Sequence, residues 1–297
     1  GGDQNHGFSQ RFVGDHSPNY PGSPRTVDHG VLTGTAGPDR ISLKKSGRGQ
    51  NAYQIHDEDV AIESIKYINL IGSELRSGKD VQPISLSIGL MLPHQPFAAR
   101  REDYSIYEGR MTLPRTPQPF NNELHPHIAQ WRRATNTAEV PDEEVLRART
   151  AYWALVTRMD TMIGEIIEAL RRNDLSDDTL IVYMSDHGEQ VGEHGLWWKQ
   201  TFYEDSVKVP AILSWPGILP ENQRCDRIIS SLDLNATMVE ALGAPPLPNS
   251  RGRPLLELLC NPELEWEDVA YSEFCLDGAG AGGPFPERGI YQRMVRR

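Results

Sequence analysis

The sequence contains little cysteine, little basic charge and no long apolar run, and each shortage excludes a class of protein. The three cysteines, Cys225, Cys260 and Cys275, form no C-x-x-C pair, which excludes a disulfide framework and a cysteine-rich zinc site; we expect free, buried thiols. Lysine and arginine number 30 against 41 acidic residues, and a net charge of −11 argues against a nucleic-acid partner. No apolar run approaches the roughly 18 residues of a membrane span, so we expect none.

Glycine and proline, in contrast, are plentiful. The chain has 26 glycines and 22 prolines, and 38% of its 297 residues are hydrophobic, which suits a core that carries long loops. Residues 1–55 are rich in small and polar residues, and prolines recur through 98–140, so we expect long loop regions in both. The length is sufficient for one large α/β domain.

Three segments carry helix signals, either apolar residues at helical spacing or residues typical of helix ends. We expect helices over 56–75, 141–173 and 231–243. Acidic residues 57–59 suit the start of the first. In the third, Asp233 is the expected N-cap and Gly243 the expected residue beyond the last turn.

Short apolar runs of strand type alternate with these helices. We expect strands over 83–92, 177–186, 207–215 and 267–274. The run 177–186 is almost continuously apolar in its centre, which is typical of a parallel sheet. Strand and helix in alternation predict an α/β layer sandwich.

Asp186, His187 and Gly188 stand at the carboxyl end of an expected strand, where open α/β sheets bind ligands. Neighbours on a strand point to opposite faces, so both side chains reach one ion only if the chain turns there, and Gly188 eases that turn. A carboxylate and an imidazole make half of a ligand shell for a divalent cation. The alternative is a capping aspartate beside a solvent-facing histidine.

Lys199 follows Asp186 by thirteen residues, after a loop that exposes Trp197 and Trp198 unless it folds over something. A lysine beside aromatic side chains can bind an oxygen of a sulfate or phosphate group as a point charge. The alternative is a surface lysine whose stem lies over a tryptophan.

His94 lies between Pro93 and Pro96, directly after the expected strand 83–92. A histidine at a strand's carboxyl end can protonate a leaving oxygen or hold an ester. The alternative is a histidine whose hydrogen bonds are satisfied within its own loop.

The segment SDHGEQVGEHGLWWKQTFYEDSVKVPAIL (185–213) resembles the C-terminal signature of the type I sulfatases of the alkaline phosphatase superfamily, especially choline-sulfatase-like and iduronate-sulfatase-like members. PHQPF (93–97) is similar to their mid-chain histidine motif. GDQNHGF (2–8), with His6, and the segment 230–259 resemble two further stretches of these proteins. The matches run in order along most of the chain.

The resemblance implies a fold and a role for each candidate site residue. It implies a single sulfatase-like α/β domain over 1–297, with a mixed, mostly parallel sheet flanked by helices, and a C-terminal subdomain that begins within 244–297. Asp186 and His187 would be metal ligands, with Ca²⁺ the usual ion and Mg²⁺ or Mn²⁺ the alternatives. Lys199 would bind the sulfate group, and His94 would contact the ester and help the leaving group depart. The substrate would be a small-molecule sulfate ester.

The sequence departs from the family at the nucleophile. Sulfatases make a formylglycine from a C/S-x-P/A-x-R motif, and no such motif is present. CNPEL (260–264) has Leu264 in place of arginine, and beside GSPRT (22–26), which has an arginine, Pro21 occupies the position of the nucleophile. The early paired aspartates and the K-x-H motif are also missing. We therefore interpret the chain as an incomplete sulfatase-like fold that carries the C-terminal half of the active site and is inactive alone.

Several alternatives stay open. A phosphodiester or phosphonate-ester hydrolase of the same superfamily shares the Asp-His-Gly signature, and a non-catalytic truncated relative would keep the fold alone. The compartment, whether cytoplasmic, periplasmic or secreted, and a homo-oligomeric state are equally open.

Overall fold

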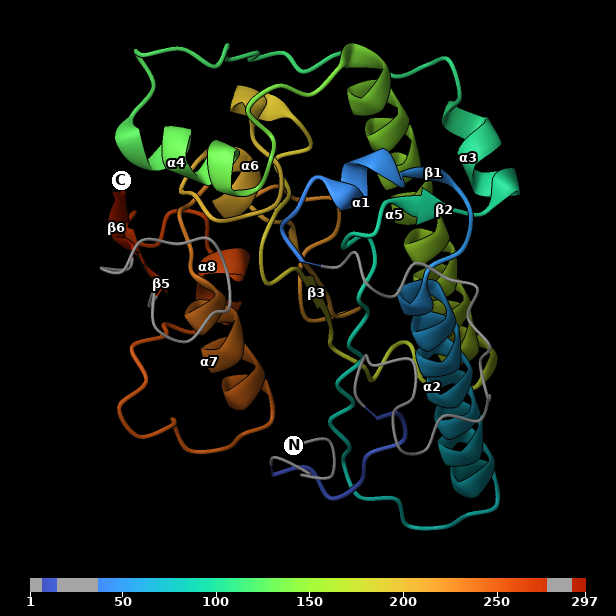
Figure 1. Cartoon of the computed structure of the whole chain (residues 1–297). Coiled ribbons are helices and arrows are strands. Elements are labelled where there is room, and N and C mark those ends of the chain that lie inside the picture. Colours follow the sequence, from blue (N-terminus) through green and yellow to red (C-terminus); the bar gives the residue numbers. More distant parts are fainter. Residues whose placement is uncertain (1–6, 15–36, 277–289) are drawn as a thin grey trace. The chain divides into compact units, whose positions relative to one another are not determined.

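The computed structural model describes residues 7–14, 37–276 and 290–297 (Figure 1). The chain divides into two compact units, which are described separately. The first unit comprises Gly1–Leu175 and Val191–Trp197, and the second comprises Ser176–Gln190 and Trp198–Arg297. His6 and residues 15–36, part of the expected loop region 1–55, lie outside the described residues.

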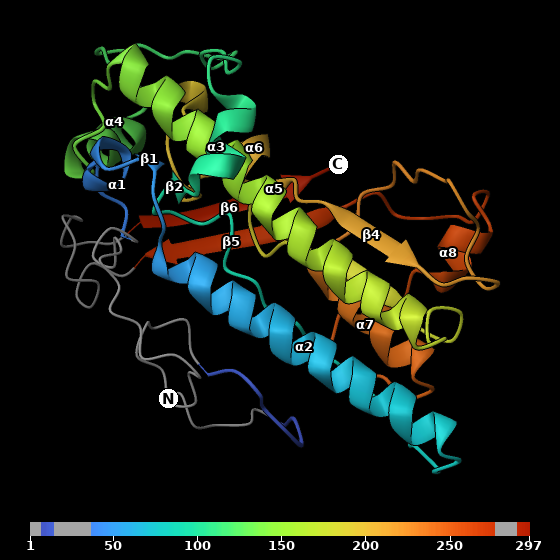
Figure 2. The ribbon, with the colours of Figure 1, turned by 90° about the vertical axis from the view of Figure 1, so that its right-hand side faces the viewer.

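Two long helices, α2 (Ala52–Arg76) and α5 (Asp142–Arg172), lie side by side in the first unit (Figure 2). Helix α5 begins after Pro141, with three acidic residues in its first turn, where they face the positive end of the helix dipole. Of its five apolar residues at helical spacing, Leu155, Met162 and Ile166 are buried, and Met159 and Leu170 are half-buried.

Helix α2 begins earlier than the acidic residues 57–59 had indicated. Asn51 is its N-cap, and the Asn51 side chain accepts the backbone N–H of Gln54 at 2.9 Å. The acids Asp57 and Asp59 therefore lie inside the helix, where both are buried. Their role is tertiary, and they do not mark a helix end.

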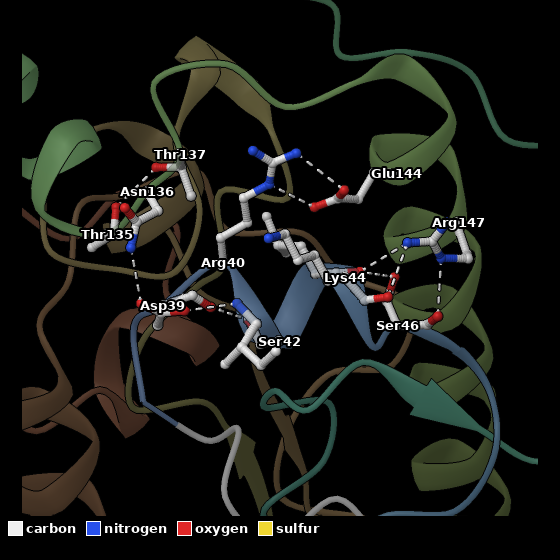
Figure 3. A network of polar contacts seen from close by, with 12 residues as sticks. Asp39, Arg40, Ser42, Lys44, Ser46, Thr135, Asn136, Thr137, Glu144 and Arg147 are labelled. Atoms are coloured by element: carbon white, nitrogen blue, oxygen red, sulfur yellow. Dashed lines mark hydrogen bonds and ion pairs between the residues drawn. The ribbon is translucent and has the colours of Figure 1, made fainter.

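The remaining elements of the first unit are short. Arg40, beside α1, donates to both carboxylate oxygens of Glu144 at 3.1 and 3.3 Å, and Arg147 donates to the Ser46 carbonyl at 3.0 Å, so α5 holds α1 in place (Figure 3). Strands β1 and β2 pair in parallel. These elements are α1 (Ile41–Lys44), β1 (Gly47–Arg48), β2 (Ala98–Ala99), α3 (Arg101–Tyr107), α4 (Pro126–Ala134) and the 3₁₀ turn η1 (Glu193–Gly195).

The described part of the expected loop region 1–55 contains α1, β1 and the start of α2, so it is not loop throughout. Two further expectations for this unit are wrong. The region 98–140 is not loop throughout, because α3 and α4 interrupt it; Pro126, which suggested a loop, is the first residue of α4, where its missing N–H costs nothing. The apolar run 83–92 forms no strand. Ile84 is 41% exposed, and among the described residues no neighbouring strand accepts or donates backbone hydrogen bonds to this run.

In the second unit, β3 (Ile181–Met184) and β4 (Ala211–Ser214) fall within the expected strands 177–186 and 207–215. They pair antiparallel, with Ile181 opposite Ser214 and Met184 opposite Ala211. The partner of 177–186 among the described residues is thus antiparallel, whereas the sequence predicted a parallel neighbour. Continuous apolar character predicts burial and does not determine the direction of the neighbour. In this unit β3 is half-buried, and Ile212 of β4 is 59% exposed.

Helix α7 (Ser231–Ala241) packs Leu234 against Leu255 and Leu258 in the core of this unit. Its N-cap is Ser230, and the expected cap Asp233 instead completes a capping box by accepting the Ser230 N–H at 2.8 Å. Gly243 follows the helix at φ 64°, as expected. The other elements are α6 (Glu204–Val207), α8 (Leu256–Cys260), and the antiparallel pair β5 (Ala270–Leu276) and β6 (Ile290–Arg296).

The three cysteines are free, as expected, but they are exposed, so the expectation of buried thiols is wrong. Each lies in a segment near or on the surface of the second unit. Within the described ranges, no helix has both the length and the apolar character needed to cross a membrane.

Candidate active site

Asp186 and His187 lie just beyond the carboxyl end of β3, where the chain leaves the strand. The Asp186 side chain is 85% exposed and that of His187 30% exposed. The His187 backbone N–H donates to Asp186 Oδ1 at 3.0 Å, and His187 Nε2 lies 3.5 Å from Asp186 Oδ2. The turn therefore brings the carboxylate and the imidazole to the same side of the chain.

The other ring nitrogen of His187 selects the tautomer. Nδ1 lies 2.9 Å from the carbonyl oxygen of Gly188, an acceptor, so Nδ1 carries the hydrogen and donates it. In the neutral ring Nε2 bears the lone pair, and in the protonated ring Nε2 carries a second N–H, 3.5 Å from Asp186 Oδ2. Histidine ligands of metals are commonly oriented in this way, through a backbone carbonyl on the second nitrogen.

Gly188 is required here by a close approach. It does not adopt a positive φ, so the ease of turning expected from the sequence is not the reason. A Cβ at this position would lie 2.0 Å from the carbonyl oxygen of Asp205, and the Gly188 N–H donates to the Ser206 carbonyl at 2.8 Å. The segment that carries Asp186 and His187 therefore packs directly against the backbone of 205–206.

Lys199 is tied to the same segment. The Gln190 N–H donates to the Trp198 carbonyl at 2.9 Å, and the Trp198 N–H donates to Glu189 Oε1 at 2.5 Å. The buried Gln190 amide also donates to Ser206 Oγ at 2.6 Å and to Thr201 Oγ1 at 3.1 Å. Residues 186–190 and 198–206 are thus interlocked within the second unit.

Lys199 experiences opposing electrostatic effects. Its burial lowers the pKa of the ammonium group, while the negative charges of Glu189 and Asp186 act against that decrease. Two carboxylates therefore lie within electrostatic reach of Lys199. The sequence pattern assigns no role to Glu189. Its position three residues after Asp186, in the same turn, was the signal that could have predicted one.

The two tryptophans are buried and line no open surface. Trp197 is 2% exposed and contacts Phe97 within the first unit, with ring centroids 6.0 Å apart. Trp198, in the second unit, is fully buried. Neither tryptophan is therefore exposed as an unfolded loop would expose it.

His94 belongs to the first unit. Its N–H donates to the Met91 carbonyl at 3.0 Å, its Nδ1 lies 2.8 Å from the Gln95 carbonyl oxygen, and its ring meets that of Tyr53 edge-on at 5.6 Å. The structure thus brings together Asp186, His187 and Lys199 in one unit and holds His94 in a well-defined loop of the other.

The donors present fit part of a metal shell. Donor atoms of one ion bound at about 2.0–2.6 Å can lie as close as the carboxylate and imidazole do here. Throughout the described part of the chain, however, no group of three or more His, Cys, Asp or Glu side chains is placed to hold a metal ion. A carboxylate and an imidazole such as those of Asp186 and His187 would fill only part of a Ca²⁺ shell, which takes about six to eight ligands.

Comparison with known proteins identifies the fold class and then the family. A phosphonate monoester hydrolase from Silicibacter pomeroyi is structurally similar, with a TM-score of 0.62 and 25% identity over 72% of this chain and 45% of that chain. This is the α/β fold of the alkaline phosphatase superfamily, as expected. The sulfatase family model matches residues 3–244. The chain belongs to the sulfatase family.

Two curated relatives are similar in sequence. The choline-sulfatase of Rhizobium meliloti (strain 1021) is 32% identical over 82% of this chain and 48% of its own length. Arylsulfatase K of Canis lupus familiaris is 32% identical over 65% of this chain and 38% of its own length. The chain thus spans less than half the length of these two relatives.

Proposed function

We propose that the chain supplies part of the active site of a metal-dependent sulfate-ester hydrolase, within one sulfatase-like domain. The observation that carries this proposal is the interlocked pair of segments in the second unit, which gathers Asp186, His187 and Lys199. The match to the sulfatase family runs through residues of both units, which supports a single domain with a C-terminal subdomain beginning within 244–297.

In this proposal Asp186 and His187 hold a divalent cation, Ca²⁺ or alternatively Mg²⁺ or Mn²⁺. Such an ion, when bound, polarises the oxygens of the ester group. Lys199 binds a sulfate oxygen as a point charge, and Glu189 holds the backbone at Trp198 in place beside it. His94 contacts the ester oxygen and transfers a proton to the leaving group. The formylglycine nucleophile of the family has no precursor motif in this sequence.

An assay of ester hydrolysis tests the proposed function as a whole. We expect the purified chain to release no appreciable nitrophenol from p-nitrophenyl sulfate or from bis(p-nitrophenyl) phosphate, with or without Ca²⁺ or Mn²⁺. Robust sulfate release would contradict the conclusion that the nucleophile is missing. Hydrolysis of the diester would instead favour the second candidate, a phosphonate or phosphodiester hydrolase, which the likeness to the Silicibacter pomeroyi enzyme supports.

NMR can test the proposed metal-binding and sulfate-binding roles in the absence of ester hydrolysis. Mn²⁺, which is paramagnetic, should selectively broaden the NMR signals of the His187 ring, and the Asp186→Asn variant should remove that broadening. Inorganic sulfate should shift the backbone signals of 186–190 in the wild type and in Lys208→Ala, whose lysine is exposed in the same unit, but not in Lys199→Ala. Equal responses in the two lysine variants would contradict the assignment of Lys199.

A further inference from the structure

Side chains at the start of α2 hold the segment that follows His94 through hydrogen bonds. The Asn51 amide donates to the Pro96 carbonyl at 2.6 Å, and the Gln54 amide donates to the Ala98 carbonyl at 2.8 Å. Both polar side chains are fully buried. Their hydrogen bonds therefore fix the chain on the C-terminal side of His94 to the end of a long helix.

One turn further along α2, the Asp57 carboxylate accepts hydrogen bonds from the segment that precedes His94. The Met91 N–H donates to Asp57, 2.9 Å from each carboxylate oxygen, and the Leu92 N–H donates to Oδ2 at 2.8 Å. The Asp57 side chain is fully buried, with His56 Nδ1 2.9 Å from its Oδ1. The Met91 carbonyl in turn accepts the N–H of His94 at 3.0 Å, so two short links join Asp57 to His94.

The His94 ring itself is held from the same helix. The Tyr53 ring lies edge-on to the imidazole, with centroids 5.6 Å apart and planes at 76°. Tyr53 and Asp57 are four residues apart on α2 and therefore occupy the same helix face. One face of α2 thus supports both the backbone and the ring of His94.

A buried carboxylate is costly unless its oxygens accept hydrogen bonds. The buried Asp57 carboxylate accepts backbone N–H groups of the run 83–92, which has no strand partner among the described residues. The two N–H groups that Asp57 accepts are the last before the His94 turn. We propose that Asp57 is a positioning residue, which sets the place of the His94 imidazole; its catalytic relevance rests on the function proposed above for His94.

The conservative variant Asp57→Asn tests this. Asparagine keeps the shape but replaces one accepting oxygen with an NH₂ group, which repels the N–H it faces. We expect the His94 ring signals to move and the nuclear Overhauser effect between the Tyr53 and His94 rings to weaken at least twofold. Glu63→Gln is the matched control, because Glu63 lies on the same helix and pairs with Lys66 at 2.7 Å, away from this segment. It should leave both readouts unchanged.

A folded Asp57→Asn variant with wild-type His94 signals and an unchanged Tyr53–His94 effect would overturn the proposal, even if its melting temperature had fallen. Hydrogen exchange in the wild type keeps the proposal testable if the variant does not fold. The Met91 and Leu92 amides should exchange on the order of a hundredfold more slowly than in an unstructured peptide. Exchange at the unstructured rate would refute it. Neither readout involves ester hydrolysis, so the assays of the proposed function can fail independently.

Discussion

Single residues decide how closely the two loop segments of the candidate site approach each other, and Gly188 is the sharpest case. The Gly188→Ala variant would place a Cβ 2.0 Å from the Asp205 carbonyl oxygen, so the backbone must move. We expect a loss of about 1–3 kcal/mol in the free energy of unfolding, measured with denaturant. The second unit should also show shifted amide signals at 186–190.

Gly164→Ala is the matched control for this substitution. Gly164 lies inside α5 with no atom within 4 Å of an added Cβ, so alanine should stabilise the helix by about 0.5–1 kcal/mol. Opposite signs for the two glycine variants are therefore expected. A neutral Gly188→Ala result would show that the close approach is relieved easily.

Glu193 provides a second test at the residue scale, within the first unit. Burial alone would raise the pKa of Glu193, but hydrogen bonds from Thr116 and Arg115 and the charge of Arg149 outweigh it and hold the pKa below its ordinary value of 4.5. Because the folded-state pKa is the lower one, the carboxylate stabilises the fold fully above about pH 4.5 and loses this effect as the pH falls through the folded value.

We expect Glu193→Gln to cost about 1–3 kcal/mol at pH 7, the range for hydrogen bonds to charged groups. The difference from the wild type should shrink as the pH falls below about 4.5. Unfolding in denaturant at several pH values measures this difference. Glu123→Gln, at an exposed position of the same unit, should show no such pH-dependent difference. A gap that stays constant with pH would contradict the role of the Glu193 charge.

At the scale of elements, α7 depends on its cap. Ser230 Oγ accepts the Leu232 N–H at 3.3 Å while Asp233 accepts the Ser230 N–H at 2.8 Å, so the cap satisfies donors that the helix cannot. We expect Ser230→Ala to destabilise the chain by about 1 kcal/mol, measured by denaturant unfolding. Ser231→Ala, one residue on and inside the helix, should be neutral or stabilising. Equal losses would show that the cap contributes nothing.

At the scale of the whole molecule, the proposed metal site leads to a prediction about Ca²⁺, because Asp186 and His187 would fill only part of a ligand shell. With two donors from this chain, we expect a dissociation constant of about 10⁻³ M or weaker. Added Ca²⁺ at about 1 mM should therefore stabilise the fold by no more than about 0.4 kcal/mol, a small shift in melting temperature. A shift of several degrees at micromolar Ca²⁺ would show that this chain alone holds a complete site.

Much of the molecule is predictable from local patterns. Helical spacing predicted α5, apolar runs predicted β3 and β4, and the strand-end Asp186-His187 pair with Lys199 predicted which loops carry the candidate site. These signals are local, because spacing along the chain records which face of an element is buried. The α/β class follows from these local signals, whereas the sulfatase family follows from the resemblance of 185–213 to its signature and from the match of the family model to 3–244.

Tertiary structure alone decided which groups become partners. The antiparallel direction of β3 and β4, the burial of Trp197 and Trp198, and the contact between Gly188 and Asp205 all join segments whose distance along the chain carries no signal. Asp57 is the clearest example. A run of acidic residues indicates a helix start, and only the fold shows that Asp57 accepts backbone N–H groups of the residues before His94. A sequence pattern reports that a group is buried, while the identity of its partner depends on how distant segments pack.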